Sequence, residues 1–214
     1  VAPGARAVRE NWIEGVEVIR YKAPARPLST LKPWHPVHAA SLLKVLHGGL
    51  QATRIATSGG ATHVFALWGL PCGEWARRVA RETGIDYSVW MLGSDVWTLG
   101  RVPVLRAALA RVIRNARHAY ADGYKLADEA RRISGERVDF LPSTRRVNLV
   151  DPPRPRRQAP YRLLFLGRWH PNKGVDLLLG ALELLDDTDW KSIERVEIQG
   201  GGPLEDLVHE RVGA

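Results

Sequence analysis

The chain has 214 residues with a formal net charge of +8, and 45% of its residues are apolar and 25% charged. These proportions are typical of a globular protein and exclude a disordered chain, and no apolar run approaches the roughly 18–20 residues that cross a bilayer. A single cysteine, Cys72, excludes an intrachain disulfide and a thiolate metal site, so we expect a soluble protein of the cytoplasm.

Residues 1–141 alternate between strand-like and helix-like patterns. Strands are predicted at residues 16–21, 62–67, 87–92, 119–121 and 138–141. Helices are predicted at residues 37–56, 74–82, 103–118 and 124–133. The pair Gly48-Gly49 is a candidate break in the first helix, residues 23–36 predict a Pro-rich loop, and Gly93-Ser94-Asp95 predicts a turn.

Residues 142–160 change character, because five prolines and five arginines crowd together there. We interpret residues 151–160 as a linker between an N-terminal domain at residues 1–150 and a C-terminal domain that begins at residue 161. In the second domain, strands are predicted at residues 162–166 and 195–199, and helices at residues 175–185 and 204–212.

This alternation predicts an α/β fold with two Rossmann-like domains, each a parallel sheet with helices on both faces. The second domain has only two predicted strands, too few for a stable domain. The sequence also starts at Val1 and ends directly after a short amphipathic run. We therefore expect a piece of a longer protein, with both domains truncated.

Positive charge is concentrated in the middle of the chain. Residues 101–162 hold 15 Arg or Lys against 6 Asp or Glu, a net charge of +9. On the predicted helix at 103–118, Arg106, Arg114 and Arg117 lie opposite the apolar face. Such a face is either solvated or in contact with anionic lipid or a phosphorylated substrate. Nucleic acid is not an expected partner, because no recognition pattern or stacking aromatics accompany these arginines.

Residues 164–176, Leu-Phe-Leu-Gly-Arg-Trp-His-Pro-Asn-Lys-Gly-Val-Asp, combine an apolar strand, a turn expected at Gly167, and a helix start. In open parallel sheets, ligands bind beyond the carboxyl ends of the strands, where Arg168 falls. The helix start offers free N–H groups to an anion, and Arg168 and Lys173 add two cations. The arrangement suits a diphosphate, although an ordinary strand–loop–helix connection with surface cations explains the same spacing.

The same segment resembles the Gly-Arg…Lys-Gly motif of the family 4 glycosyltransferases, which are retaining enzymes of the GT-B fold. Gly200-Gly201-Gly202-Pro203 is similar to their Gly-x-Gly-Pro loop after the next strand. Residues 66–73 and 93–97 are similar to two first-domain segments, and residues 141–144 stand where the family has Pro-Asn-Gly. The order and rough spacing of five segments agree, so the resemblance covers essentially the whole chain.

The resemblance implies that a nucleotide-diphosphate sugar binds mainly to the second domain, across a cleft from the acceptor. Arg168 and Lys173 would be catalytic by stabilising the leaving diphosphate, and the donor-binding set would be Gly167, Arg168, Lys173, Gly201 and Gly202. On the first domain, Asp95 would orient an acceptor hydroxyl, and the cleft would be lined by Gly93, Ser94, Ser143 and Thr144.

The activity implied is sugar transfer to an acceptor hydroxyl with retention, in glycan or glycolipid biosynthesis at the inner face of the cytoplasmic membrane. No cofactor and no obligatory metal are implied, and the histidines show no ligand spacing with a third partner that would predict a metal site. The sequence does not identify the sugar, the nucleotide or the acceptor.

Several family features are replaced or missing. The first strand with its Gly-rich loop would precede Val1, and the Glu-x7-Glu motif would follow Ala214. Leu67 and Leu92 stand where the family has histidines, and Ser143 replaces its asparagine. A subfamily with different acceptor chemistry and a drifted, weak enzyme both explain these changes, and the retained donor cations favour the first.

Two other functional classes stay open at this point. One is a GT-B relative such as a nucleotide-sugar epimerase, and the other is a non-catalytic basic module that binds anionic membranes through residues 101–162. Asp95 has an alternative role as well, because an aspartate in a turn often caps backbone N–H groups.

Overall fold

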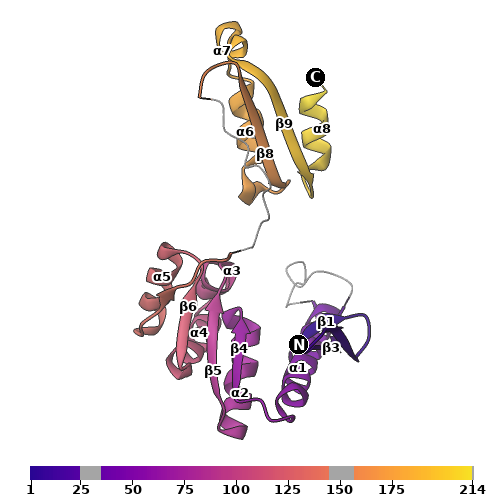
Figure 1. Ribbon diagram of the computed structural model, residues 1–214, viewed down its shortest axis with the longest axis vertical. Helices are drawn as coiled ribbons and strands as arrows, with labels where there is room; N and C mark the ends of the chain where they lie inside the picture. The colour runs from indigo at the N-terminus through magenta and orange to yellow at the C-terminus, as the bar shows by residue number, and fades with distance from the viewer. Residues whose placement is uncertain (25–34, 145–156, 214) are drawn as a thin grey trace. The chain divides into compact units, whose positions relative to one another are not determined.

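The computed structural model of the protein describes residues 1–24, 35–144 and 157–213. The chain forms two compact units, Val1–Arg145 (unit 1) and Arg146–Ala214 (unit 2) (Figure 1). Most of the predicted loop at 23–36 and of the predicted linker at 151–160 lies outside the described residues.

Unit 1 begins with a small mixed sheet in the order β1-β3-β2, formed by β1 (Ala2–Gly4), β2 (Val8–Ile13) and β3 (Val16–Lys22). β2 and β3 form an antiparallel hairpin, whereas β1 pairs parallel with β3. The predicted strand at 16–21 is confirmed, but its expected place in a single parallel sheet is wrong. The hairpin was not predicted because the sequence of β2 is rich in charged and polar residues. Cross-strand ion pairs stabilise it, including Arg20–Glu10 at 2.7 Å.

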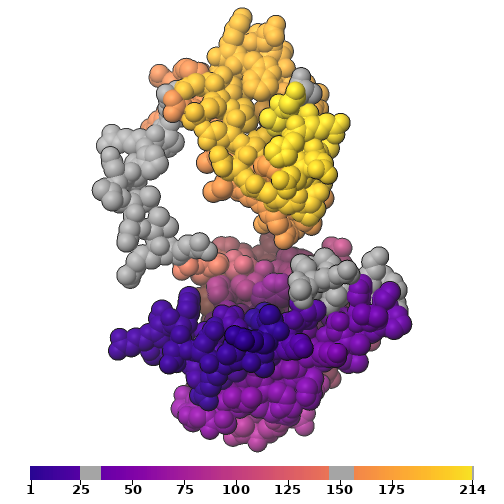
Figure 2. All heavy atoms as spheres, turned by 90° about the vertical axis from the view of Figure 1, so that its right-hand side faces the viewer, coloured from indigo at the N-terminus to yellow at the C-terminus, as the bar shows by residue number. Residues whose placement is uncertain are grey.

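Helix α1 (Pro36–Thr57) packs on β3 and is continuous, so the candidate break at Gly48-Gly49 is wrong. These glycines instead allow close packing: a β-carbon on Gly49 would lie 2.3 Å from the Trp75 ring, and one on Gly48 would lie 3.3 Å from Tyr21. In the space-filling view of Figure 2, the indigo atoms of the first residues lie beside the purple atoms of the following segment.

The larger sheet of unit 1 has the order β4-β5-β6-β7, and all its strands are parallel. They are β4 (His63–Leu67), β5 (Asp86–Met91), β6 (His118–Ala121) and β7 (Asp139–Phe140). Three longer helices connect them, namely α2 (Glu74–Thr83), α4 (Pro103–Asn115) and α5 (Tyr124–Ser134). The predicted α/β class with a parallel sheet is therefore confirmed for this part of the chain, and the sheet is compatible with a Rossmann-like fold.

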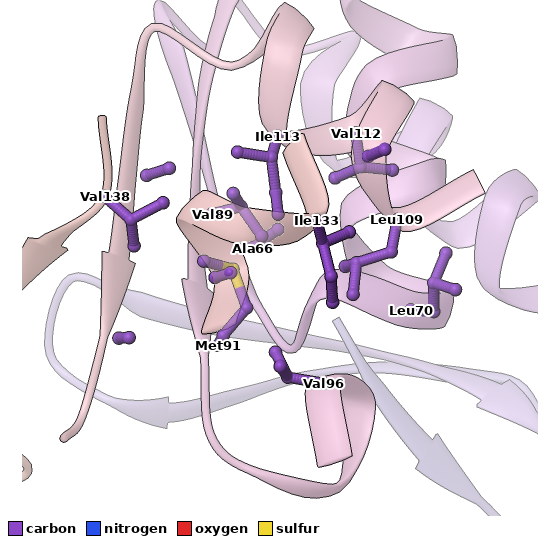
Figure 3. Packing of buried hydrophobic residues seen from close by; sticks show 14 of the residues in the cluster. Ala66, Leu70, Val89, Met91, Val96, Leu109, Val112, Ile113, Ile133 and Val138 are labelled. Carbon is purple, nitrogen blue, oxygen red and sulfur yellow. The ribbon is translucent and has the colours of Figure 1, made fainter. Parts of the chain in front are cut away.

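The larger of two buried clusters in the described part of unit 1 lies between this sheet and its helices (Figure 3). Val89 and Met91 from β5 meet Leu109, Val112 and Ile113 from α4, and all five are at most 2% exposed. On the opposite face of the sheet, Phe65 and Leu67 remain 47% and 49% exposed. In the described part of the chain, the expected cover of helices on both faces is thus not found.

Unit 2 contains one parallel pair, β8 (Tyr161–Arg168) and β9 (Ile193–Gly201). Helices α6 (Val175–Leu182), α7 (Asp187–Lys191) and α8 (Glu205–Val212) complete its described part. Its core is formed by Trp169, Val175, Leu179 and Val208. The predicted helix at 175–185 ends early, and α7, with its Asp186–Asp189 capping box, was not predicted.

Two segments that were predicted as turns belong to a strand and a helix instead. β8 runs through Gly167 and Arg168, because its pairing with β9 continues as Gly167↔Gly200 and Arg168↔Gly201. The chain therefore turns after Arg168 and not at Gly167. The predicted turn at residues 93–95 is the start of a short helix, α3 (Ser94–Trp97).

Candidate functional site

The carboxyl ends of β8 and β9 bring together the two segments that carry the predicted donor site. After β8, the chain passes through Trp169 and His170 into a short 3-10 turn at Pro171–Lys173, and α6 follows. After β9, it passes through Gly202-Pro203 into α8. Because the strands are parallel neighbours, both loops lie at the same edge of the sheet.

Gly200 near the end of β9 and Gly202 directly after it allow the ends of the two strands and their loops to approach closely. A β-carbon on Gly200 would lie 2.0 Å from the carbonyl oxygen of Gly167, and one on Gly202 would lie 2.7 Å from that of Trp169. Two backbone hydrogen bonds join the loops, from Trp169 N–H to Gly201 O (2.9 Å) and from Leu204 N–H to Trp169 O (3.1 Å). The edge is thus a tightly packed backbone platform, in which a side chain at position 200 or 202 has no room.

Arg168 and Lys173 stand on this platform as exposed cations. In the described part of the chain, neither side chain forms an ion pair or a hydrogen bond. Gly174, in the left-handed conformation (φ 75°), ends the 3-10 turn and starts α6, whose first N–H groups have no partner within the helix. Two free cations, a helix start and close backbone together form an environment for an anion with several oxygens.

Trp169 fixes the position of this loop. Its indole is buried among Val175, Leu179 and Val208, and its ring lies edge-on to His209. The backbone of the same residue forms hydrogen bonds with Gly201 and Leu204, so the C-terminal neighbour of Arg168 is both buried and hydrogen-bonded. Sequence reasoning missed this role, although a tryptophan between two candidate ligands was a visible signal.

His170 and Asn172 form the outer side of the loop. The Nδ1 of His170 accepts a 3.3 Å hydrogen bond from the Asn172 backbone N–H. The histidine is therefore engaged in shaping the 3-10 turn that presents Lys173.

Asp95 in unit 1 is completely buried, with 0% of its surface exposed. Its carboxylate accepts hydrogen bonds from the backbone N–H groups of Gly69 (2.7 Å), Gly93 (3.0 Å) and Leu92 (3.3 Å). Burial raises the pKa of this carboxyl, and the backbone hydrogen bonds only partly oppose the rise. The geometry supports the capping alternative for Asp95 and leaves no free carboxylate oxygen for an acceptor.

A different carboxylate lies at the carboxyl edge of the parallel sheet. Asp122 follows β6 directly and is half-buried in a shallow depression of about 600 Å³ that Gly93, Trp97 and Tyr124 also line. Tyr124 stacks on Phe140 with 4.2 Å between ring centroids, and Trp97 is 44% exposed. Sequence reasoning missed Asp122, although it is the first charged residue after a buried strand.

The remaining first-domain candidates lie at the same edge of this sheet. Ser94 begins α3, and Ser143 and Thr144 are exposed and follow β7 without regular structure. The indole N–H of Trp90 donates to the Leu141 carbonyl (3.0 Å) and so anchors the segment that leads to them. Trp68, at the end of β4, is 43% exposed and has a left-handed φ of 82°, which is a strained conformation for a bulky residue.

Among the described residues 101–144, several arginines are engaged within unit 1. Arg106 pairs with Glu129 (3.5 Å), Arg117 pairs with Asp86, and the Arg114 guanidinium donates to the Ser134 carbonyl (2.9 Å). Arginines on this face of α4 therefore have partners within unit 1, and the face is not a continuous patch of free cations.

The other reactive side chains give no indication of a second chemistry. Burial raises the pKa of the Cys72 thiol to about 11, so it stays protonated and is a poor nucleophile at neutral pH. Among the described residues, no group of three His, Cys, Asp or Glu side chains is arranged to hold a metal ion.

No protein-family model and no curated protein matches this sequence. None of the described helices combines the length and apolar character that crossing a membrane requires. The function must therefore be inferred from the site itself.

Proposed function

We propose that this chain belongs to a retaining glycosyltransferase of the GT-B type, which moves a sugar from a nucleotide diphosphate to an acceptor hydroxyl. The observation that carries the proposal is the meeting of Arg168, Lys173 and the Gly200–Gly202 loop at one edge of the β8–β9 sheet. Unit 2 would supply the donor side and unit 1 the acceptor side.

The chemistry follows from where charge develops during transfer. The bond between the anomeric carbon and the diphosphate oxygen breaks, and negative charge accumulates on the leaving diphosphate. Arg168 offers a planar fork to two phosphate oxygens and Lys173 a mobile point charge, and both stabilise that charge. The acceptor oxygen bonds to the anomeric carbon on the face that the diphosphate leaves, so configuration is retained, and its proton passes to the departing phosphate oxygen.

On the acceptor side, Asp122 is a better candidate than Asp95. Its carboxylate is half-buried beside Trp97 and Tyr124, whose exposed rings offer apolar surfaces against which a sugar can stack. Asp95 would act indirectly, by holding Gly69 and Gly93 at the edge of the sheet.

The proposal is tested by titrating the full chain with UDP and GDP. We expect Lys173→Ala to weaken binding of the preferred nucleotide at least tenfold. Lys191→Ala is the matched control, because Lys191 ends α7 just before β9 and so lies at the opposite end of the sheet. Equal affinity of the Lys173→Ala variant and the unmodified chain would refute the assignment. Product analysis with donor alone separates transfer from epimerisation, because an epimerase needs no acceptor.

A further inference from the structure

A second concave site lies in unit 1, between β3 and one face of α1. The cavity has a volume of about 750 Å³, within the range of roughly 300–1,000 Å³ that is typical of small-molecule sites. Its floor is apolar and comes from Ile19 and Tyr21 on β3 and from Leu43, Ala52 and Ile55 on α1. We call it the α1 groove.

The α1 side of the groove follows helical geometry. Ser41, Lys44, Gly48, Gln51 and Ile55 succeed one another at spacings of three and four residues, so they share one face of the helix. Gly48 has no side chain, and this lets the helix backbone lie close to Tyr21. α1 also packs against Trp75 and Val79 of α2, in a buried cluster that includes Ile19, Tyr21 and Ala52 from the floor of the groove.

The charges at the groove have one sign. Arg20, Lys22 and Lys44 contribute cations, His47 adds a titratable ring, and no Asp or Glu is among the described lining residues. Arg20 is engaged with Glu10 at 2.7 Å. In the described chain, the ammonium groups of Lys22 and Lys44 form no ion pair and remain available.

An apolar floor with two free ammonium groups is complementary to a molecule with one apolar chain and an anionic head. We propose that the α1 groove binds a single-chain anionic amphiphile, such as an alkyl phosphate or a fatty acid, as an individual molecule. The chain would cover Leu43 and Ile55, which are 66% and 51% exposed, and removing such apolar surface from water favours binding by roughly 25 cal/mol per Å². The head would be held by Lys22 and Lys44. Because the site is concave, it fits a single bound molecule better than it fits the flat surface of a bilayer.

The test uses the full chain and dodecyl phosphate below its micellar concentration, with binding followed by calorimetry. Dodecyl maltoside has the same chain with a neutral head, and butyl phosphate has the same head with a short chain. We expect each of these two probes to bind at least tenfold more weakly than dodecyl phosphate. Equal binding of the neutral probe would overturn the proposal, as would binding to anionic phospholipid vesicles without binding of the monomer.

Variants locate the site and keep the proposal falsifiable. We expect the double variant Lys22→Ala with Lys44→Ala to weaken dodecyl phosphate binding at least fivefold, and Ser41→Trp to abolish it by filling the groove. Lys125→Ala, at an exposed lysine of α5, should leave it unchanged. The charge variants lie at exposed positions, and circular dichroism verifies that each variant is folded. Unchanged affinity in both groove variants would refute the proposal, whereas failure of UDP and GDP to bind bears only on the site in unit 2.

Discussion

The carboxylate of Asp95 accepts a 2.7 Å hydrogen bond from the backbone N–H of Gly69, a residue 26 positions earlier in the chain. With its bonds from Leu92 and Gly93, it ties the segment after β4 to the segment after β5. A β-carbon on Gly69 would lie 2.3 Å from a Leu109 methyl, so this connection is also packed tightly against α4. The first parallel strand pair of the sheet is thus fastened at its carboxyl edge by one buried side chain.

Replacing this carboxylate should therefore destabilise unit 1. We expect Asp95→Ala to lower the free energy of unfolding by about 3 kcal/mol, because one buried and two partly buried N–H groups lose their acceptor. Urea denaturation followed by circular dichroism measures the change. A loss below about 1 kcal/mol would show that water replaces the carboxylate.

The same residue gives a pH dependence of known sign. Because burial raises the pKa of Asp95 above its unfolded value, the folded state binds the proton more tightly. Its contribution to stability is full below the unfolded pKa, about 3.9, and is lost as the pH rises through the folded pKa. We expect the stability advantage of the unmodified chain over Asp95→Asn to shrink from pH 3 towards pH 7. An advantage that grows over this range would contradict the assignment.

Glu74 should show the opposite sign. Burial acts to raise its pKa, but hydrogen bonds from Arg77 and Arg78 outweigh burial and lower it. The stability that it contributes is present above the unfolded pKa, about 4.3, and is lost as the pH falls through the folded pKa. Glu74→Gln should cost about 3 kcal/mol at pH 7, because it leaves the buried Arg77 without its partner. Urea titrations at pH 7 and pH 3 should show a much smaller cost at the lower pH, and an equal cost at both would refute the prediction.

The glycines at the carboxyl end of β9, Gly200 to Gly202, give a matched set for the platform of unit 2. Gly200→Ala and Gly202→Ala should each destabilise unit 2 by about 2 kcal/mol, because their β-carbons would overlap backbone atoms. Gly201→Ala is the control, since a β-carbon there meets nothing within 4 Å. Trp169 lies beside these residues, so tryptophan fluorescence during thermal unfolding is a suitable measurement. Three equally stable variants would show that the loop relaxes freely.

Close packing at the crossing of α1 and α2 can be tested in the same way. Gly49→Ala should destabilise unit 1 by about 2 kcal/mol, because the new methyl would lie 2.3 Å from the Trp75 ring. Gly59→Ala, in the open turn after α1, should have little effect, since nothing lies within 4 Å of a β-carbon there. Chemical denaturation of both variants provides the comparison, and a Gly49→Ala variant as stable as the control would refute it.

For the proposed donor site, the kind of cation at position 168 should matter as well as its charge. Arg168→Lys keeps the charge but loses the planar fork, so we expect nucleoside diphosphate affinity to fall about three- to tenfold. Arg168→Ala should weaken it further. Calorimetric titration with UDP and GDP measures both changes, and a lysine variant that binds like the unmodified chain would reduce the role of Arg168 to that of a point charge.

Local patterns in the sequence predicted most helices and strands, because their periodicity reflects burial. Gly84 and Gly135 follow the helices predicted at residues 74–82 and 124–133, and both adopt left-handed conformations with φ of 77° that end α2 and α5. Patterns failed where pairing between distant residues decides the structure. Gly167 is a strand residue because Gly200 lies opposite it, and the polar β2 is a strand because β3 pairs with it.

The candidate site was predictable in part for the same reason. Arg168 and Lys173 could be found from their place at the end of a strand and before a helix. The burial of Asp95 could not, since it depends on Gly69 arriving from a different strand end. The availability of Asp122 likewise depends on the surroundings that α3 and α5 create.

The topology of unit 1 has a consequence for the order in which it folds. β2 and β3 are joined by the two residues Glu14-Gly15, so their hairpin needs almost no loop closure and can form within about 1–10 μs. Each parallel pair of the β4–β7 sheet forms only after the chain has closed a complete helical crossover. The conformational entropy of that crossover is lost before the strand contacts that compensate for it can form. The N-terminal hairpin should therefore acquire structure early in refolding, and the sheet whose edge carries Asp95 and Asp122 should be completed late.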